Sequence, residues 1–176
     1  YGGTIRLLKA RAELGQIGLR LVDQADAGAF ASALRERPRL VLVETPSNPL
    51  MRIVDIRSIC TMAHEVQAEV AVDNTFLSPA IQQPLALGAD YDIHSTTKYL
   101  NGHSDVIGGA VVAADAVQVE ALRHWANVVG STGAPFDAWL TLRGLRTLFP
   151  RMEWQQANAM AVAHYLESYA TVAKVH

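Results

Sequence analysis

Residues 70–76, Val-Ala-Val-Asp-Asn-Thr-Phe, and residues 91–98, Tyr-Asp-Ile-His-Ser-Thr-Thr-Lys, decide the fold of this chain. Each stretch begins with residues that favour β-strands and ends in polar residues. The apolar run 40–43, Leu-Val-Leu-Val, ends in the same way, because Glu-Thr-Pro-Ser-Asn-Pro follows it at 44–49. Strands that end in polar side chains are typical of parallel sheets, which bind ligands beyond their carboxyl ends.

The segments between these runs change to helical spacing. Asp55 and Asp26 can each cap a helix, and Ser78-Pro79 is typical of a helix start. The apolar residues that share a face of these helices are Ile56, Ile59, Cys60 and Ala63 after Asp55, and Phe30, Ala33 and Leu34 after Asp26. The alternation of strands and helices predicts an α/β fold, with a mostly parallel sheet and helices on both faces. We expect one continuous domain over residues 1–176.

One strand is predicted to break the parallel pattern. Only residues 99–105 separate Lys98 from the apolar run Val106–Val112. A parallel crossover needs about a dozen residues, so this run should be antiparallel to its predecessor. Leu19–Val22 is a weaker strand candidate. Helical spacing predicts three further helices, over Val117–Asn127, over Phe136–Leu148 and after Pro150.

Composition excludes several classes of protein. Fifteen Lys and Arg against 17 Asp and Glu give a net charge of −2, which disfavours binding to nucleic acid or an anionic membrane surface. No apolar run approaches the roughly 20 residues of a membrane span. The lone Cys60 indicates a reducing compartment, so we expect the cytoplasm. Because the sequence starts at Tyr1 without an initiator Met, we expect a segment of a longer polypeptide.

Three polar residues of different types follow three successive predicted strands: Asn48, Asp73 and Lys98. A lysine can form a Schiff base with a carbonyl group, and an acid can pair with a protonated ring nitrogen. The hydroxyls of Ser95 and Thr97 flank Lys98 and can bind phosphate. Together these are the groups that pyridoxal phosphate requires. Taken singly, each has a plainer explanation as a surface lysine, a turn residue or a strand end.

Other cofactor and metal signatures are absent from the sequence. Neither Gly2-Gly3 nor Gly108-Gly109 forms the Gly-x-Gly-x-x-Gly pattern of a nicotinamide or flavin site, and no phosphate-binding loop or Gly-x-Ser-x-Gly motif is present. Four histidines have no acidic or cysteine partner at ligand spacing, so no metal site is predicted: His64, His124, His164 and His176.

The longest motifs resemble one enzyme family. Residues 95–105, Ser-Thr-Thr-Lys-Tyr-Leu-Asn-Gly-His-Ser-Asp, are preceded by the stretches at 72–76 and 44–49. Together they are similar to the Cys/Met-metabolism family of pyridoxal-phosphate enzymes. The resemblance continues through Tyr1-Gly-Gly-Thr4 and through residues 136–148, so it covers essentially the whole chain. It implies the large domain of a fold-type I transferase.

The resemblance implies a role for each residue of the cofactor site. Lys98 would hold pyridoxal phosphate as a Schiff base and then move protons. Asp73 would pair with the pyridinium nitrogen and keep it protonated. Ser95 and Thr97 would bind phosphate oxygens. The ends of the predicted strands also pointed to these four residues, and to Asn48.

Tyr1 and Asn48 would complete the cofactor site and contact the substrate. Tyr1 would stack its ring on the cofactor, with its phenol near the reacting centre. Asn48 would contact the phenolic oxygen of the cofactor and the carboxylate of the substrate. In the family, an upstream arm and a C-terminal domain supply further groups, and neither has a counterpart in residues 1–176.

The implied reaction is a γ-replacement on an amino-acid substrate. Cysteine thiol would displace succinate from O-succinyl-homoserine, on the path to methionine. A γ-lyase, a sulfhydrylase and a protein that kept the fold without the chemistry remain alternatives. Because the family shares an arm between subunits, the resemblance implies a homo-oligomer, expected as a tetramer built from two dimers.

Overall fold

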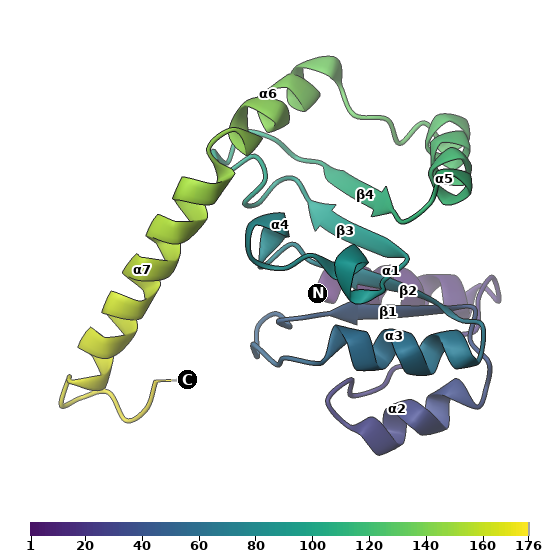
Figure 1. Ribbon diagram of the computed structural model, residues 1–176, viewed down its shortest axis with the longest axis horizontal. Helices are drawn as coiled ribbons and strands as arrows, with labels where there is room; N and C mark the ends of the chain where they lie inside the picture. The colour runs from purple at the N-terminus through teal and green to yellow at the C-terminus, as the bar shows by residue number, and fades with distance from the viewer. Residues whose placement is uncertain (176) are drawn as a thin grey trace. The chain divides into compact units, whose positions relative to one another are not determined.

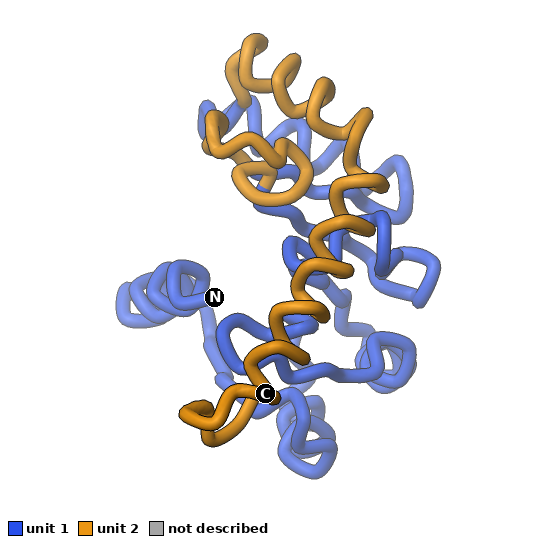
Figure 2. The backbone as a smooth tube through the Cα atoms, turned by 90° about the vertical axis from the view of Figure 1, so that its left-hand side faces the viewer, with its two compact units in different colours: residues 1–95, 109–132 blue, residues 96–108, 133–176 orange. Residues whose placement is uncertain are grey.

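The computed structural model describes residues 1–175, and the chain divides into two compact units (Figure 2). Unit 1 comprises residues 1–95 and 109–132, and unit 2 comprises residues 96–108 and 133–175. The first boundaries between the units fall at the ends of two strands. The chain passes from unit 1 to unit 2 after Ser95 and returns to unit 1 at Gly109. Each unit is described separately below.

Unit 1 is built on a four-stranded sheet in the order β1-β2-β3-β4 (Figure 1). Its strands are β1 (Leu40–Glu44), β2 (Glu69–Asp73), β3 (Tyr91–Ser95) and β4 (Gly109–Ala113). The first three are parallel, and β4 runs antiparallel to β3. This confirms the predicted α/β fold and the direction of each strand, including the one antiparallel strand.

The strand β4 is shorter than predicted and starts at Gly109 instead of Val106. The next pair in register, Thr96 and Gly108, keeps only one of its two ladder bonds, from Thr96 N to Gly108 O at 2.9 Å. Gly108 N donates instead to Thr97 Oγ1 at 3.1 Å, and Thr96 O accepts from Asn101 N, so the pairing ends there.

The core of unit 1 lies between the sheet and the helix α3 (Ile56–Glu65). Asp55 caps α3 by accepting from Ser58 N at 3.2 Å, as predicted. The helix buries the four residues expected from its spacing, and they pack with Val43, Val70 and Val72, each 1% exposed or less. Burial of this periodic apolar face stabilises the α3–sheet pair.

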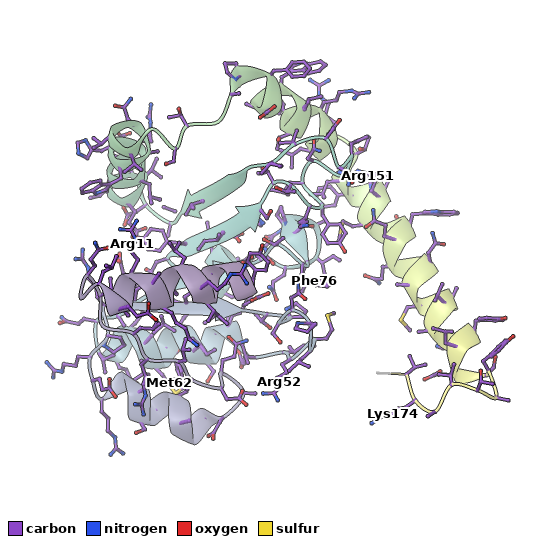
Figure 3. The ribbon with its side chains drawn as sticks, turned by 180° about the vertical axis from the view of Figure 1, so that it is seen from behind. Arg11, Arg52, Met62, Phe76, Arg151 and Lys174 are labelled. Atoms are coloured by element: carbon purple, nitrogen blue, oxygen red, sulfur yellow. The ribbon has the colours of Figure 1, made fainter. Side chains whose placement is uncertain are left out.

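A second capped helix, α2 (Ala27–Leu34), adds Phe30 and Leu34 to the same core. Its cap is Asp26, whose Oδ1 accepts from Ala29 N at 2.9 Å. Figures 1 and 3 show α1 (Gly2–Glu13) on the other side of the sheet from α3. Unit 1 also contains α4 (Ser78–Ile81), the 3₁₀ helix η1 (Pro84–Leu87) and α5 (Ala116–Val129).

The weak strand predicted at Leu19–Val22 does not form. Leu21 is 52% exposed, and no strand in residues 1–175 pairs with this segment. The prediction was wrong because β-propensity produces a strand only where a neighbour accepts its hydrogen bonds.

Unit 2 contains the loop 96–108 and two helices, α6 (Pro135–Leu145) and α7 (Leu148–Glu167). The helix predicted to reach Leu148 ends three residues earlier, and the long helix begins before Pro150. Thr147 explains the first difference, because its N–H and its hydroxyl both donate to Gly144 O, at 3.1 and 3.2 Å. Pro150 lies in the first turn of α7, where a helix has no use for the missing N–H.

Candidate active site

Asp73 is the last residue of β2, the strand that lies between β1 and β3. It pairs in register with Glu44 of β1 and with Ile93 of β3. Its side chain is half-buried, and Oδ1 accepts a hydrogen bond from Thr75 N at 3.1 Å. The other carboxylate oxygen is a second acceptor at the carboxyl end of the sheet.

Thr75 connects Asp73 to the end of the neighbouring strand. Its Oγ1 accepts a hydrogen bond from Ser95 N at 2.8 Å, and Ser95 is the last residue of β3. Asn74 N also donates to Ile93 O at 2.9 Å. The structure therefore brings Asp73 and Ser95 together through Thr75, a residue that the sequence analysis did not single out.

A buried amide pair extends this connection to the end of β1. Gln82 Nε2 lies 3.0 Å from both Asn74 Oδ1 and Thr45 O, and Asn74 Nδ2 donates to Gln82 O at 2.9 Å. Asn74 and Thr45 are 1% exposed or less. These hydrogen bonds fix the carboxyl ends of three strands. In the sequence, the only indication of them is the polar residue Asn74 directly after Asp73.

Tyr1 and Asn48 both lie beside Glu44, at the end of β1. Asn48 N donates to Glu44 Oε1 at 3.1 Å, and the amino group of Tyr1 contacts the other carboxylate oxygen. The side chains of Tyr1 and Asn48 are exposed. Within residues 1–175, neither is hydrogen-bonded to Asp73 or Ser95, so the structure joins these predicted site residues to Glu44 only.

The remaining two predicted site residues, Thr97 and Lys98, belong to unit 2 (Figure 2). Thr97 Oγ1 accepts from Gly108 N at 3.1 Å and donates to Gly108 O at 3.4 Å. The side chain of Lys98 is exposed, and its carbonyl accepts from Gly102 N at 2.8 Å. Thr97 therefore helps close the loop that carries Lys98.

A buried contact between a histidine and an aspartate precedes Ser95 and was not predicted. His94 Nε2 lies 3.0 Å from Asp92 Oδ1, and both side chains are less than 10% exposed. Asp92 pairs in register with Val72, so the pair lies on the core side of the sheet. It therefore belongs to the opposite face from Asp73 and Ser95.

The structure gives one predicted structural histidine an acidic partner. His64 Nε2 lies 2.9 Å from Asp90 Oδ2, which also accepts from Val70 N at 2.7 Å. Within residues 1–175 no group of three His, Cys, Asp or Glu side chains is placed to hold a metal ion. His176 lies outside the described residues.

The polar groups that the two units offer are of the kinds that pyridoxal phosphate needs. Unit 1 offers a half-buried carboxylate for a protonated ring nitrogen and a strand-end hydroxyl for phosphate. Unit 2 offers the exposed amine of Lys98 for the aldehyde.

None of the helices in residues 1–175 has the length and apolar character needed to cross a bilayer.

Comparison with known families decides the membership of the chain. Residues 1–176 match the family described as "Cys/Met metabolism PLP-dependent enzyme", where PLP is pyridoxal phosphate. The chain belongs to this family. It is therefore part of a PLP-dependent transsulfuration enzyme family, as its motifs indicated.

Individual relatives carry more specific names. The chain is 56% identical to the cystathionine γ-synthase of Escherichia coli (strain K12), over 100% of this chain and 46% of the relative. It is 41% identical to a cystathionine γ-lyase of Dictyostelium discoideum, over 99% of this chain and 45% of the relative. The chain thus spans about half the length of the curated relatives it matches.

A solved structure has the same fold. It is a crystal structure of cystathionine γ-synthase from Xanthomonas oryzae pv. oryzae in complex with aminoacrylate and cysteine, which superposes with a TM-score of 0.97 at 55% identity. The match covers 99% of this chain and 45% of that chain. The α/β architecture described above is therefore that of a PLP-dependent transferase.

Proposed function

We propose that the full-length protein containing this chain performs the cystathionine γ-synthase reaction, in which cysteine thiol replaces the succinate of O-succinyl-homoserine. One observation carries the proposal. The Asp73 carboxylate, at the end of the central parallel strand, is hydrogen-bonded through Thr75 to the end of β3, whose next residues lead to Lys98. The 56% identity to the Escherichia coli enzyme supports the choice of reaction.

Asp73 provides the electrostatic part of the mechanism. Pyridoxal phosphate, when bound, withdraws electrons from the carbon atoms of the substrate. In this proposal the Asp73 carboxylate accepts a charge-assisted hydrogen bond from the ring nitrogen and holds its proton. Thr75 N–H donates to Oδ1 and orients the carboxylate, which leaves Oδ2 as the acceptor for the ring nitrogen.

Ser95 and Thr97 provide phosphate ligands in the proposal. The backbone of Ser95 is fixed by its bond to Thr75, which holds its hydroxyl at the strand end. Thr97 Oγ1 accepts a good hydrogen bond from Gly108 N, whereas its own donation to Gly108 O is long, at 3.4 Å. Its proton is therefore available for a stronger acceptor such as a phosphate oxygen.

Lys98 provides the amine that binds the cofactor covalently and moves protons on the substrate. It follows Ser95 by three residues in the chain. The only other lysines are Lys9, in α1, and Lys174, beyond α7. Neither follows a strand.

Tyr1 and Asn48 complete the proposed site. Asn48 is anchored through its backbone N–H beside Glu44, the in-register neighbour of Asp73, and the side chains of Asn48 and Tyr1 are exposed. We assign the Tyr1 ring to stacking on the cofactor and its phenol to proton transfer near the reacting centre. Asn48 is assigned to the phenolic oxygen of the cofactor and to the substrate carboxylate.

A γ-lyase acting on cystathionine is the second candidate, favoured by the identity to the Dictyostelium discoideum relative. Product analysis of the full-length protein separates the two. We expect cystathionine and succinate from O-succinyl-homoserine plus cysteine, and little turnover of cystathionine alone. Rapid breakdown of cystathionine with no synthesis would replace the first assignment by the second.

The assignment of Lys98 is tested by Lys98→Ala in the full-length protein, with Lys9→Ala as the matched control. Lys98→Ala should abolish turnover and leave the circular dichroism spectrum unchanged, whereas Lys9→Ala should leave both turnover and spectrum unchanged. Mass spectrometry after borohydride reduction should locate the cofactor on Lys98. Cofactor found on Lys9 or Lys174 would overturn the assignment.

We further propose that the full-length protein is a homo-oligomer with closed symmetry, a tetramer built from two dimers. The support is the family's use of an arm from a neighbouring subunit in each active site. Light scattering should give a mass of at least twice the subunit. A monomer with full activity at assay concentration would contradict the shared site.

A further inference from the structure

The loop that carries Lys98 is closed on itself by backbone hydrogen bonds within unit 2. Gly102 N donates to Lys98 O at 2.8 Å, and Asn101 N donates to Thr96 O at 3.2 Å. Asn101 is 1% exposed, and its Nδ2 donates to Asp105 Oδ1 at 2.6 Å. The peptide groups beside Lys98 are therefore fixed, while its side chain remains exposed.

Arg151, labelled in Figure 3, lies in the first turn of α7 and binds the carbonyl of Tyr99, the residue that follows Lys98. Its Nη1 donates to Tyr99 O at 2.9 Å, its Nη2 donates to Gly144 O at 2.8 Å, and its Nε donates to Thr147 Oγ1 at 3.1 Å. One guanidinium thus joins the lysine loop, the end of α6 and the start of α7.

Two glycines make this contact sterically possible. A Cβ atom on Gly102, whose φ is +75°, would lie 2.0 Å from Arg151 Nη1. A Cβ atom on Gly144 would lie 2.1 Å from Asn101 O. Both distances are far below van der Waals contact, so the loop backbone lies directly against the guanidinium and α6, with no room for a side chain at either position.

The partners of Arg151 are unusual for a charged residue. Within residues 1–175 it forms no ion pair, and all three hydrogen bonds go to neutral oxygens. Burial lowers the pKa of its guanidinium below the ordinary value, although a guanidinium keeps its charge in proteins. A half-buried guanidinium that binds only uncharged oxygens indicates that the planar arrangement of its donors matters more than its charge.

We propose that Arg151 is a positioning residue for Lys98, which fixes the carbonyl of the next residue, Tyr99, and thereby the loop backbone that sets the direction in which the Lys98 amine is presented. The proposal rests on the function proposed above, in which this amine binds the cofactor and moves protons. Arg151 acts through the backbone and does not touch the reacting atoms. The planar guanidinium binds the Tyr99 and Gly144 carbonyls through two separate nitrogens, an arrangement that the single nitrogen of a lysine does not reproduce.

The test uses Arg151→Met and Arg151→Lys in the full-length protein, with Arg143→Met on the exposed part of α6 as control. Hydrogen exchange is measured on the cofactor-free protein. We expect the amides of residues 99–102 to exchange about tenfold faster in Arg151→Met, with strands β1–β3 unchanged. Arg151→Lys, which keeps a single donor group, should be intermediate, and Arg143→Met should match the parent protein.

Kinetics provide the second readout. A misdirected amine should lower kcat on the order of 100-fold with little change in KM, and it should slow covalent trapping of the cofactor by borohydride. The proposal is overturned if residues 99–102 keep their protection in Arg151→Met, or if protection is lost uniformly over α6, α7 and the loop. Should Arg151→Met fail to fold, the same comparison is decided by Arg151→Lys.

Failure of the proposed function is recognised separately. A fully active Lys98→Ala variant would remove Lys98 from the chemistry, whatever the exchange result. Conversely, an inactive Lys98→Ala together with unchanged exchange and kcat in Arg151→Met would leave the proposed function standing and overturn the role of Arg151.

Discussion

The core of unit 1 and the lysine loop of unit 2 are held by different forces. The core packs apolar side chains of α2 and α3 against the sheet, and its members at Val43, Val70 and Val72 are almost fully buried. The loop 96–108 also buries two apolar side chains, Leu100 and Val106, but its backbone is held in addition by hydrogen bonds around the buried Asn101 and by glycine contacts.

This difference affects how each region responds to substitution. Apolar packing is spread over many side chains, so the loss of one contact lowers stability without changing the geometry of the others. A hydrogen bond or a backbone contact depends on one position, and that position has no substitute. We therefore expect larger and more local effects in the loop than in the core, and a site built on the loop is correspondingly sensitive.

The largest effect is expected for Gly144→Ala. Alanine usually stabilises a helix interior relative to glycine by ~1 kcal/mol. Here the new Cβ would lie 2.1 Å from Asn101 O, so the free energy of unfolding should fall by about 3 kcal/mol. Urea denaturation followed by circular dichroism measures the change.

Gly28→Ala in α2 is the matched control for this substitution. The nearest atom to its Cβ would be Asp26 Oδ1 at 3.4 Å, an ordinary contact, so the variant should gain up to about 1 kcal/mol. Equal gains in stability at Gly144 and Gly28 would show that α6 and the loop are not in close approach.

A smaller effect is expected in unit 1 when the N-cap of α3 is removed. Asp55→Ala loses the hydrogen bond from Ser58 N and should lower the free energy of unfolding by ~1 kcal/mol, with kcat unchanged. Asp55→Asn keeps a capping oxygen and should lose much less. If the Asn and Ala variants were equally destabilised, the stabilising contribution would not be the cap.

A further effect, confined to alkaline pH, is a pH dependence in the core. Burial raises the pKa of the Cys60 thiol from 9.0 to about 11, so the folded state resists ionisation of this group. The resulting stabilisation is fully present below pH 9.0 and is lost as the pH rises through about 11, because the unfolded chain ionises first. The difference in unfolding free energy between the parent protein and Cys60→Ala should therefore shrink over this range. A constant difference would contradict the raised pKa.

The sequence alone determined the alternation of strands and helices, the buried face of α3 and the direction of β4. Hydrophobic periodicity is a property of neighbouring residues, so the four buried positions of α3 could be identified without the structure. The caps at Asp55 and Asp26 depend on residues only three positions away. The antiparallel direction of β4 followed from the length of one loop.

The tertiary structure decided everything that depends on residues far apart in the chain. Tyr99 and Arg151 are 52 residues apart, and Ser95 and Thr75 are 20 apart, so no local pattern indicates their hydrogen bonds. In the sequence Gly144 has no feature that sets it apart, and only the structure shows that the carbonyl of Asn101 lies against it. Leu19–Val22 has the composition of a strand but lacks a partner, and β4 begins late because Gly108 bonds elsewhere. In each case the deciding factor is a hydrogen bond or a close contact with a distant backbone group, which the sequence does not encode locally.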